Sequence, residues 1–406
     1  MKRKILFISM CIPFDNAFHA GGKTFNYYIN HFSEDVNNDI TLIAKVLPEE
    51  KKYICHINPK IHLMLVSTPI VGLKKWLSYL KSINSKFNPC YRYGNVLTKE
   101  IYDQIEVKLL ELKNHGYQPD IVILEWTSIL LFIQRVKKYF PKAQYVASEH
   151  DVTFLGKERK VYSAKNTFER LVRNLSFSNM KKRELKAINY CDLVVTHNTK
   201  DKKLLIANGI EEKRLSVISP FFDRFDKIER KPNYKDILFY GAMNRIENSS
   251  SAIWFIDKVL PRLSDCDVRF IVVGNKPPEE LLSKTSNRII VTGFVEDVSP
   301  YFSSAMCLAA PLLLGAGIKV KIIEAMSAGI PVLTNDIGIE GIDAKADIDY
   351  IHCKSPMDYE QAIRDMISGK INLKKISENA IRFISQEYNL SESFRRYSEE
   401  IYSLLN

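Results

Sequence analysis

Short apolar runs alternate with amphipathic stretches along the first half of the chain. The run 5–9 is continuously apolar, which is typical of a parallel strand covered on both faces. Similar runs predict further strands at 40–44, 62–66, 120–124, 144–147 and 192–196. Helical periodicity predicts helices at 24–32, 74–84 and 97–115 and over a long basic stretch, 157–188.

The same alternation restarts in the second half, after the breaks at Pro220 and 231–233. Strands are predicted at 236–241, 269–274, 289–292 and 306–310, and a last amphipathic helix at 391–405. Two successive halves of this kind predict an α/β protein with two doubly wound, Rossmann-like parallel sheets. Ligands of such sheets bind at the carboxyl ends of the strands, so we expect the site in a cleft between two domains.

Length and composition agree with two globular domains. The 406 residues are too many for one ordinary core, and 46% hydrophobic with 26% charged residues is usual for a water-soluble protein. Seven scattered cysteines form no Cys-x-x-Cys pair, which indicates a reducing compartment without a disulfide framework or zinc site. We interpret the apolar start as a buried strand rather than a signal peptide, and the later run 121–133 is too short to span a bilayer.

Part of the net charge of +11 lies at 152–190, a stretch that contains ten basic residues and only three acidic ones. An anionic membrane surface, a phosphate-rich substrate and solvated helix faces each account for it. Nucleic acid is not expected as a partner, because no nucleic-acid-binding motif accompanies the charge. A second basic stretch, 70–84, sets Leu73, Trp76, Leu77 and Leu80 on one helical face edged by lysines. That face suits an anionic bilayer or packing on the domain's own sheet.

The segment 311–335 carries the most specific chemistry. An apolar run ends at the turn Gly315-Ala316-Gly317, a helix follows from about Lys319 to Ser327, and Gly329 ends it before a strand. Glycines allow close backbone approach to a ligand, and a helix start attracts anions. Lys319 and Lys321 add positive charge there, and Glu324 can accept hydrogen bonds from hydroxyls. Diphosphate on the lysines and sugar hydroxyls on the carboxylate would make a nucleotide-sugar site.

This segment resembles the donor-binding motif of family 4 (group 1) retaining glycosyltransferases, which have the GT-B fold. The matching residues are Glu324-Ala325-Met326, the Gly-Ile-Pro-Val run at 329–332, and Gly317. Ala316 stands where most of the family carries a first glutamate. The sequence instead resembles a branch with Gly-x-Gly-x-Lys-x-Lys before the second glutamate. The resemblance is strong over 236–345 and mainly architectural before residue 200.

The resemblance implies roles for further residues. Gly21 and Gly22 would face the donor diphosphate, and His150, after the strand at 144–147, would contact a substrate hydroxyl; a structural histidine and a simple tight turn are the alternatives. Gly241 would lie in a phosphate loop, whereas Gly274 and the pair Gly293-Phe294 would contact the base. His150, Lys319 and Glu324 are the expected catalytic residues. The expected donor-binding residues are Gly21, Gly22, Gly241, Gly274, Gly293, Phe294, Gly315, Ala316, Gly317 and Lys321.

The expected boundaries are an acceptor domain at 1–222, a donor domain at 223–388, and a last helix, 389–406, that by resemblance returns to the first domain. We expect transfer of a sugar, with retention of configuration, from a nucleotide diphosphate sugar to a glycan or lipid-linked acceptor in surface polysaccharide synthesis. No metal or other cofactor is expected, and the expected location is cytoplasmic, with peripheral contact to the inner face of the membrane. The alternatives are a nucleotide-sugar-binding protein without catalysis, favoured by Ala316, and a nucleotide-sugar epimerase.

Overall fold

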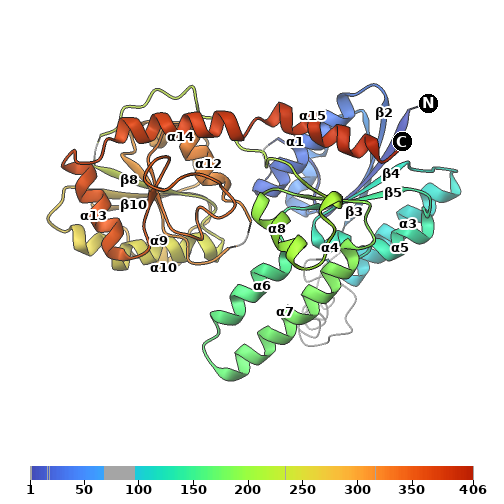
Figure 1. Cartoon of the computed structure of the whole chain (residues 1–406), viewed down its shortest axis with the longest axis horizontal. Coiled ribbons are helices and arrows are strands. Elements are labelled where there is room, and N and C mark those ends of the chain that lie inside the picture. Colours follow the sequence, from blue (N-terminus) through green and yellow to red (C-terminus); the bar gives the residue numbers. More distant parts are fainter. Residues whose placement is uncertain are drawn as a thin grey trace. The chain divides into compact units, whose positions relative to one another are not determined.

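The computed structural model divides the chain into two compact units. The first contains Met1–Phe221 and Leu390–Asn406, and the second Phe222–Asn389 (Figure 1). The structure describes residues 2–15, 17, 19–67, 97–233, 235–315 and 317–405. The expected helix at 74–84, with its apolar face, and Ala316 lie outside these residues.

The first unit is built on a seven-stranded parallel sheet in the order β3-β2-β1-β4-β5-β6-β7. The strands are β1 (Arg3–Ser9), β2 (Asn38–Val46), β3 (Ile61–Ser67), β4 (Ile121–Glu125), β5 (Gln144–Glu149), β6 (Leu193–Thr196) and β7 (Leu215–Val217). The first six lie close to the strands predicted from the sequence, whereas β7 was not predicted. The order reverses between β1 and β4, which is the doubly wound arrangement.

Helices cover both faces of this sheet because strand residues point alternately to opposite sides. Ile5 and Phe7 of β1 join a core with α1 and α15, whereas Leu6 and Ile8 join a core with the other helices. The α-helices of this unit are α1 (Ala20–Glu34), α3 (Lys99–Asn114), α4 (Thr127–Leu130), α5 (Ile133–Tyr139), α6 (Thr153–Tyr162), α7 (Thr167–Ile188), α8 (Thr199–Ala207) and α15 (Leu390–Ser403).

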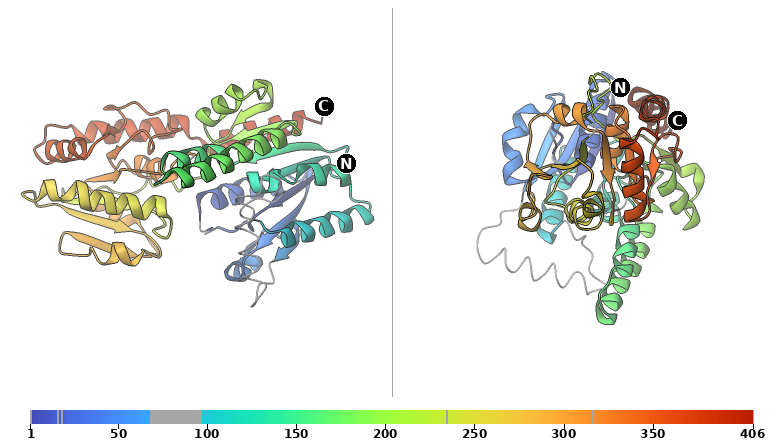
Figure 2. Two further views of the ribbon diagram at one scale, coloured as in Figure 1. Left: turned by 90° about the horizontal axis from the view of Figure 1, so that it is seen from below. Right: turned by 90° about the vertical axis from the view of Figure 1, so that its left-hand side faces the viewer.

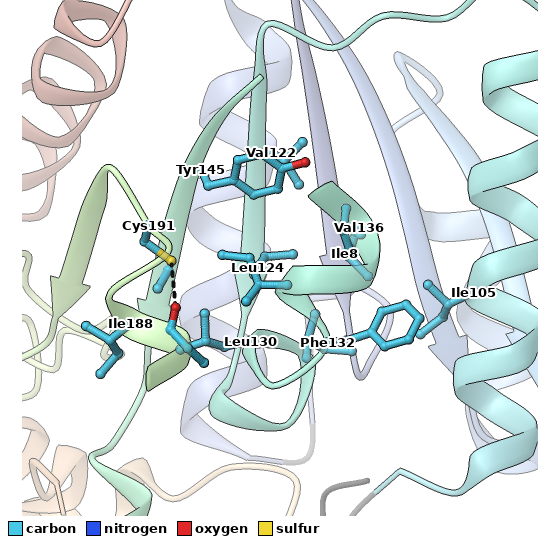
Figure 3. Packing of buried hydrophobic residues seen from close by; sticks show 14 of the residues in the cluster. Ile8, Ile105, Val122, Leu124, Leu130, Phe132, Val136, Tyr145, Ile188 and Cys191 are labelled. Atoms are coloured by element: carbon cyan, nitrogen blue, oxygen red, sulfur yellow. Dashed lines mark hydrogen bonds between the residues drawn. The ribbon is translucent and has the colours of Figure 1, made fainter. Parts of the chain in front are cut away.

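The core between the sheet and α3–α8 is shown in Figure 3. Leu124 of β4, Tyr145 of β5 and Leu130 of α4 belong to this core, and all three side chains are fully buried. At its edge the Cys191 thiol lies 3.8 Å from the carbonyl oxygen of Ala187, to which it donates. Burial of each such large apolar side chain stabilises the unit by about 1.5–3 kcal/mol.

The basic helical region expected at 157–188 is divided into the two helices of the α6–α7 hairpin. Asn166 begins α7 by accepting a hydrogen bond from the backbone N–H of Glu169 at 2.8 Å, and the chain turns between 163 and 166. The two helices pack side by side and extend from the rest of the unit (Figure 2). α15, the last helix, packs on α1: the Tyr28 hydroxyl lies 2.8 Å from Ser393 Oγ, and the rings of Phe32 and Phe394 are 5.1 Å apart.

The second unit has a six-stranded parallel sheet in the order β10-β9-β8-β11-β12-β13. Its strands are β8 (Asp236–Tyr240), β9 (Arg269–Val273), β10 (Ile289–Gly293), β11 (Cys307–Ala310), β12 (Val332–Thr334) and β13 (Ile351–His352). Its α-helices are α9 (Ile246–Lys258), α10 (Glu279–Leu282), α11 (Ser299–Ser304), α12 (Val320–Ser327), α13 (Pro356–Ile367) and α14 (Leu373–Glu387). 3₁₀ helices lie at 48–56 and 212–214 in the first unit and at 260–263 in the second. The predicted fold class, two Rossmann-like parallel sheets, is confirmed.

Candidate functional site

Three of the predicted glycines meet at the carboxyl edge of the second sheet. The N–H of Gly241 donates to the carbonyl of Val273 at 3.0 Å, and the N–H of Gly274 donates to that of Gly293 at 3.0 Å. Gly274 has φ +156°, and a Cβ there would lie 1.7 Å from the carbonyl oxygen of Gly241. Only glycine therefore fits at position 274. Phe294, the next predicted residue, is 70% exposed.

The ammonium group of Lys321 lies beside Gly241 at this edge. Its Nζ donates to Asn248 Oδ1 at 2.6 Å and lies 4.7 Å from the centroid of the Phe239 ring. A Cβ at Gly241 would approach Nζ to 2.8 Å, so the missing side chain leaves room for the ammonium group. Burial, and then the nearby charges of Arg245 and Lys319, lower the pKa of Lys321 to about 7.

The Lys319 side chain contacts the glycine turn before α12. Its Nζ donates to the carbonyl of Gly317 at 2.5 Å and lies 3.9 Å from the Glu340 carboxylate, and both side chains are nearly buried. A Cβ at Gly315 would lie 3.2 Å from Lys319 Cε. Lys321 thus lies beside Gly241, and Lys319 lies beside Gly315 and Gly317. Positive side chains next to glycine turns are expected for an anion site.

Glu324 is 3% exposed, and groups of its own unit engage both of its oxygens. The N–H of Asp223 donates to Oε1 at 3.3 Å, and the Tyr240 hydroxyl donates to Oε2. Burial and the Glu324 carboxylate raise the pKa of Tyr240 well above its usual value, so Tyr240 remains a donor. An ionised carboxylate only accepts hydrogen bonds, so Glu324 is suited to hydroxyl and N–H donors.

In the first unit, His150 lies in a cluster formed by the ends of adjacent strands. Glu125 ends β4, His150 follows β5 and His197 follows β6. His150 Nε2 lies 2.9 Å from Glu125 Oε2, and its ring stacks on that of Trp126 with centroids 4.1 Å apart. A Cβ at Gly21 would lie 3.2 Å from His150 Nδ1, so α1 crosses this cluster closely because residue 21 has no side chain.

Burial controls the charge in this cluster. Burial lowers the pKa of His150 and of His197 to about 3 each, so both imidazoles are neutral near pH 7. Burial also raises the pKa of Glu125 to about 7. The carboxyl group beside His150 therefore changes its protonation state near neutral pH.

Glu149, which precedes His150, and the predicted Gly21-Gly22 pair make contacts within this unit. Glu149 accepts a hydrogen bond from Thr127 Oγ1 at 2.5 Å, and Glu125 is the carboxyl group that contacts the imidazole. The N–H of Gly22 donates to His19 Nδ1 at 2.9 Å, which caps α1. One of the amides expected to bind phosphate is thus already engaged by a side chain.

The sequence interpretation missed Glu125, His197, Tyr240 and Asn248 as members of these clusters. Each of the first three lies at or just after the end of a parallel strand, and that position is the signal that could have identified them. Asn248 lies in the first turn of α9, and its amide Nδ2 donates to the carbonyl of Ala242 at 2.8 Å. Its contact with Lys321, 73 residues away, has no local signal.

Among the described residues, no group of three or more His, Cys, Asp or Glu side chains is arranged to hold a metal ion. The six cysteines within the described ranges are free thiols. A search of the described helices found none with the length and apolar character needed to cross a bilayer.

We expect the first unit to lose stability as the pH rises from 6.5 to 8. Burial raises the pKa of Glu125 to about 7 and of Glu184 to about 8, and raises the pKa of Glu149 well above its usual value. The unfolded chain has already released these protons by pH 6.5, whereas the folded unit releases each of them only as the pH passes the raised pKa of that group. Each retained proton lowers the free energy of unfolding by about 1.4 kcal/mol per pH unit.

Denaturant unfolding at three pH values across this window would measure the slope. Glu149→Gln mimics the protonated carboxyl group and should make the slope shallower. Stability that rises between pH 6.5 and 8 would contradict the assignment of these buried protons.

Residues 234–368 match the family model described as Glycosyl transferases group 1. An uncharacterized 44.6 kDa protein in the cps region of Klebsiella pneumoniae is 24% identical over 46% of this chain and 50% of its own length. The chain thus spans half the length of that relative. An uncharacterized glycosyltransferase of Methanocaldococcus jannaschii is 23% identical over 99% of this chain and 98% of its own.

Two solved structures share the fold over nearly the whole chain. The lipopolysaccharide outer core galactosyltransferase WaaB, in its apo form, has a TM-score of 0.66 at 16% identity, over 98% of this chain and 99% of its own. Anabaena HepE in complex with UDP has a TM-score of 0.67 at 14% identity, over 99% of this chain and 100% of its own. The family match lies on the unit that carries the glycine loops, the two lysines and Glu324. Residues 234–368 therefore resemble the group 1 glycosyltransferases, and the chain has the GT-B fold.

Proposed function

We propose that the chain transfers a sugar, with retention of configuration, from a nucleotide diphosphate sugar to a glycan or a lipid-linked acceptor in surface polysaccharide synthesis. The observation that carries this proposal is the approach of Lys319 and Lys321 to the glycine loops at the carboxyl edge of the second sheet. The cps-region relative supports a polysaccharide pathway, and the UDP complex of HepE supports a uridine nucleotide as the first donor base to test.

In this proposal the lysines and the start of α12 neutralise the diphosphate leaving group, without a metal ion. Glu324 binds donor hydroxyls, and Gly274, Gly293 and Phe294 line the base. In the first unit, Gly21 and Gly22 would face the donor diphosphate, and His150 would contact a substrate hydroxyl.

The test is incubation with a panel of nucleotide sugars, with and without acceptor glycans, and analysis of every product. Release of a nucleoside diphosphate together with a glycosylated product of retained configuration supports the proposal. A donor that binds but stays intact indicates a sugar-nucleotide-binding protein, and a changed sugar still attached to its nucleotide indicates an epimerase.

Glu324→Gln is expected to weaken donor binding or turnover by about 1–3 kcal/mol, because it removes the charge from a hydrogen-bond acceptor. The amide keeps the size of the side chain, so the contacts with Asp223 and Tyr240 can persist. Donor affinity and kcat/KM would be measured beside Tyr240→Phe, which removes one internal donor and leaves the carboxylate. Equal loss in both variants would mean that Glu324 acts through local structure rather than through the donor.

We also propose a cytoplasmic enzyme that touches the inner face of the membrane through α7. Phe168, Leu171 and Leu175 share one face of this helix and are 74%, 57% and 62% exposed. The same hairpin of α6 and α7 carries exposed basic side chains; these are Lys160, Lys165, Arg170, Lys182 and Lys186. An apolar face within a basic surface matches an anionic bilayer, to which each lysine or arginine contributes about 1 kcal/mol.

Sedimentation with vesicles that contain anionic lipid should therefore show binding that weakens as salt is added. Changing Phe168, Leu171 and Leu175 to Ser should reduce it. The same change at Val107 and Leu110, two exposed apolar residues of α3, should not. Failure to bind at low salt, or equal effects of both sets, would remove the membrane from the proposal.

A further inference from the structure

We propose that Glu125 is the positioning residue of His150: its carboxyl group holds Nε2 and so decides whether Nδ1, beside Gly21, donates or accepts a hydrogen bond. This inference rests on the proposed role of His150 as a substrate contact. It adds Glu125 to that role and makes the role depend on whether the Glu125 carboxyl group is protonated.

The geometry leaves the imidazole little freedom. Trp126 stacks on one face of the ring at 4.1 Å with an interplanar angle of 15°. Glu125 Oε2 is 2.9 Å from Nε2, and the side chains of His150 and Glu125 are only 8% and 5% exposed. The opposite ring nitrogen, Nδ1, points to the first turn of α1, where a Cβ at Gly21 would be 3.2 Å away. One nitrogen is therefore engaged inside the unit and the other faces the glycine pair.

A neutral imidazole carries one proton, and the partner at Nε2 decides where that proton lies. An ionised Glu125 can only accept, so it requires the proton on Nε2 and leaves a lone pair on Nδ1. A protonated Glu125 can donate to Nε2, and the imidazole proton then lies on Nδ1. One proton taken up by the pair thus turns Nδ1 from an acceptor into a donor.

The surroundings place this change near neutral pH. Burial raises the pKa of Glu125 to about 7, opposed by a hydrogen bond from the Ser148 side chain and by the nearby His197. Burial, and then His19, keep the pKa of His150 low, so the ring itself gains no second proton. Within the described part of the chain, Cys11 and Tyr397 also interact electrostatically with Glu125, and burial keeps both neutral.

His197 does not compete for the same role. Its Nδ1 lies 3.2 Å from the carbonyl oxygen of Ile218, a contact that requires the proton on Nδ1 in the neutral ring. Its tautomer is therefore set by the backbone and should not change with the protonation of Glu125. This leaves His150 as the histidine of the cluster whose proton can move.

Nitrogen-15 NMR of the histidine-labelled full chain tests the proposal directly, because protonated and bare ring nitrogens have distinct shifts. The His150 signals are assigned by their loss in His150→Gln. In the unsubstituted chain the proton should lie on Nε2 at pH 8.5 and on Nδ1 at pH 6. Glu125→Gln should keep it on Nδ1 at both pH values, because the amide can donate to Nε2 while Ser148 holds its carbonyl. An unchanged tautomer across this range would overturn the proposal, and this titration needs no Glu125 variant.

Activity gives the second readout. The kcat/KM of Glu125→Gln divided by that of the unsubstituted chain should be near one at pH 6 and fall roughly tenfold by pH 8.5, where the two forms differ by a charged partner. Glu149→Gln is the matched control, since burial raises the pKa of this neighbouring carboxyl group well above its usual value, and its ratio should stay constant with pH. A constant ratio for Glu125→Gln would overturn the proposal while leaving the transferase function intact. A chain that transfers no sugar would overturn the proposed function, whereas the NMR titration would still decide the role of Glu125.

Discussion

Replacing Lys319 and Lys321 together by Ala is expected to weaken binding of nucleoside diphosphates and nucleotide sugars by roughly a hundredfold or more. Each ammonium group can contribute about 1.5–3 kcal/mol through a charge-assisted hydrogen bond to phosphate. The free nucleoside lacks the phosphates, so its affinity should change little. Calorimetric titration with UDP and with uridine, each against both proteins, would measure the difference.

The pH dependence of this binding separates the two lysines. Because burial lowers the pKa of Lys321 to about 7, part of the unliganded protein has a neutral amine there at neutral pH. A diphosphate favours the protonated form, so affinity should be full below pH 7 and should fall above it, by at most about tenfold per pH unit. Lys321→Ala alone should remove this slope, whereas Lys319→Ala should retain it.

A suitable control is the double change of Lys370 and Lys374 to Ala. These lysines belong to the same unit, have side chains that are 71% and 86% exposed, and form ion pairs only at the surface. They change the net charge by the same amount, and their long-range effect on binding should disappear in salt. Equal losses in the two double variants, or equal losses for UDP and uridine, would mean that Lys319 and Lys321 do not touch phosphate.

The strands of this fold were predictable because both sheets are covered on two faces. A central strand such as β4 is buried at every position and apolar at all but its last, Glu125, so it stands out from the flanking polar segments without any alignment. The glycine turn and helix at 315–327 were predictable for a different reason: turn chemistry and helix periodicity are local properties of the sequence.

The contacts made by site residues were less accessible to prediction. His150 could be proposed from its position after a strand, but its partner is 25 residues away on the neighbouring strand. In the sequence, Glu125 is a single charged residue within the apolar run 121–133, and nothing near it indicates a histidine partner. In a parallel sheet, neighbouring strands are separated by a helix, so the residues that meet at one edge are distant in sequence. The pairing of Lys321 with Asn248 escaped prediction for the same reason.

The break between α6 and α7 shows a different limit. Helical periodicity continues through 157–188 on either side of the turn, so the pattern predicted a helical region without showing the break. The turn depends on side-chain contacts at its ends: Asn166 caps α7, and an Arg173 nitrogen lies 2.9 Å from Ser163 Oγ and also reaches the carbonyl of Lys160 at 2.5 Å. Asn and Ser are common in loops and caps alike, so periodicity alone does not show where such a turn falls.

Gly274→Ala is the substitution expected to damage the second unit most. The new Cβ would lie 1.7 Å from the carbonyl oxygen of Gly241, far inside any allowed contact, so the backbone after β8 or β9 must move. The residue also has φ +156°, which L side chains rarely adopt. We expect a loss of roughly 3 kcal/mol or more in the free energy of unfolding of this unit, at the upper end of overpacking effects.

Gly369→Ala separates the two causes. Gly369 has φ +74°, but a Cβ there would meet no atom within 4 Å, so its change tests backbone strain alone and should cost about 1 kcal/mol. Amide hydrogen exchange would locate the damage: in Gly274→Ala the amides of β8 and β9 should lose protection, whereas those of β1 should keep it. Because the displaced backbone adjoins Lys321, diphosphate binding should fall as well. If both variants were equally stable, the close approach of the two strand ends would not constrain residue 274, and the loop geometry proposed for the donor site would have to be abandoned.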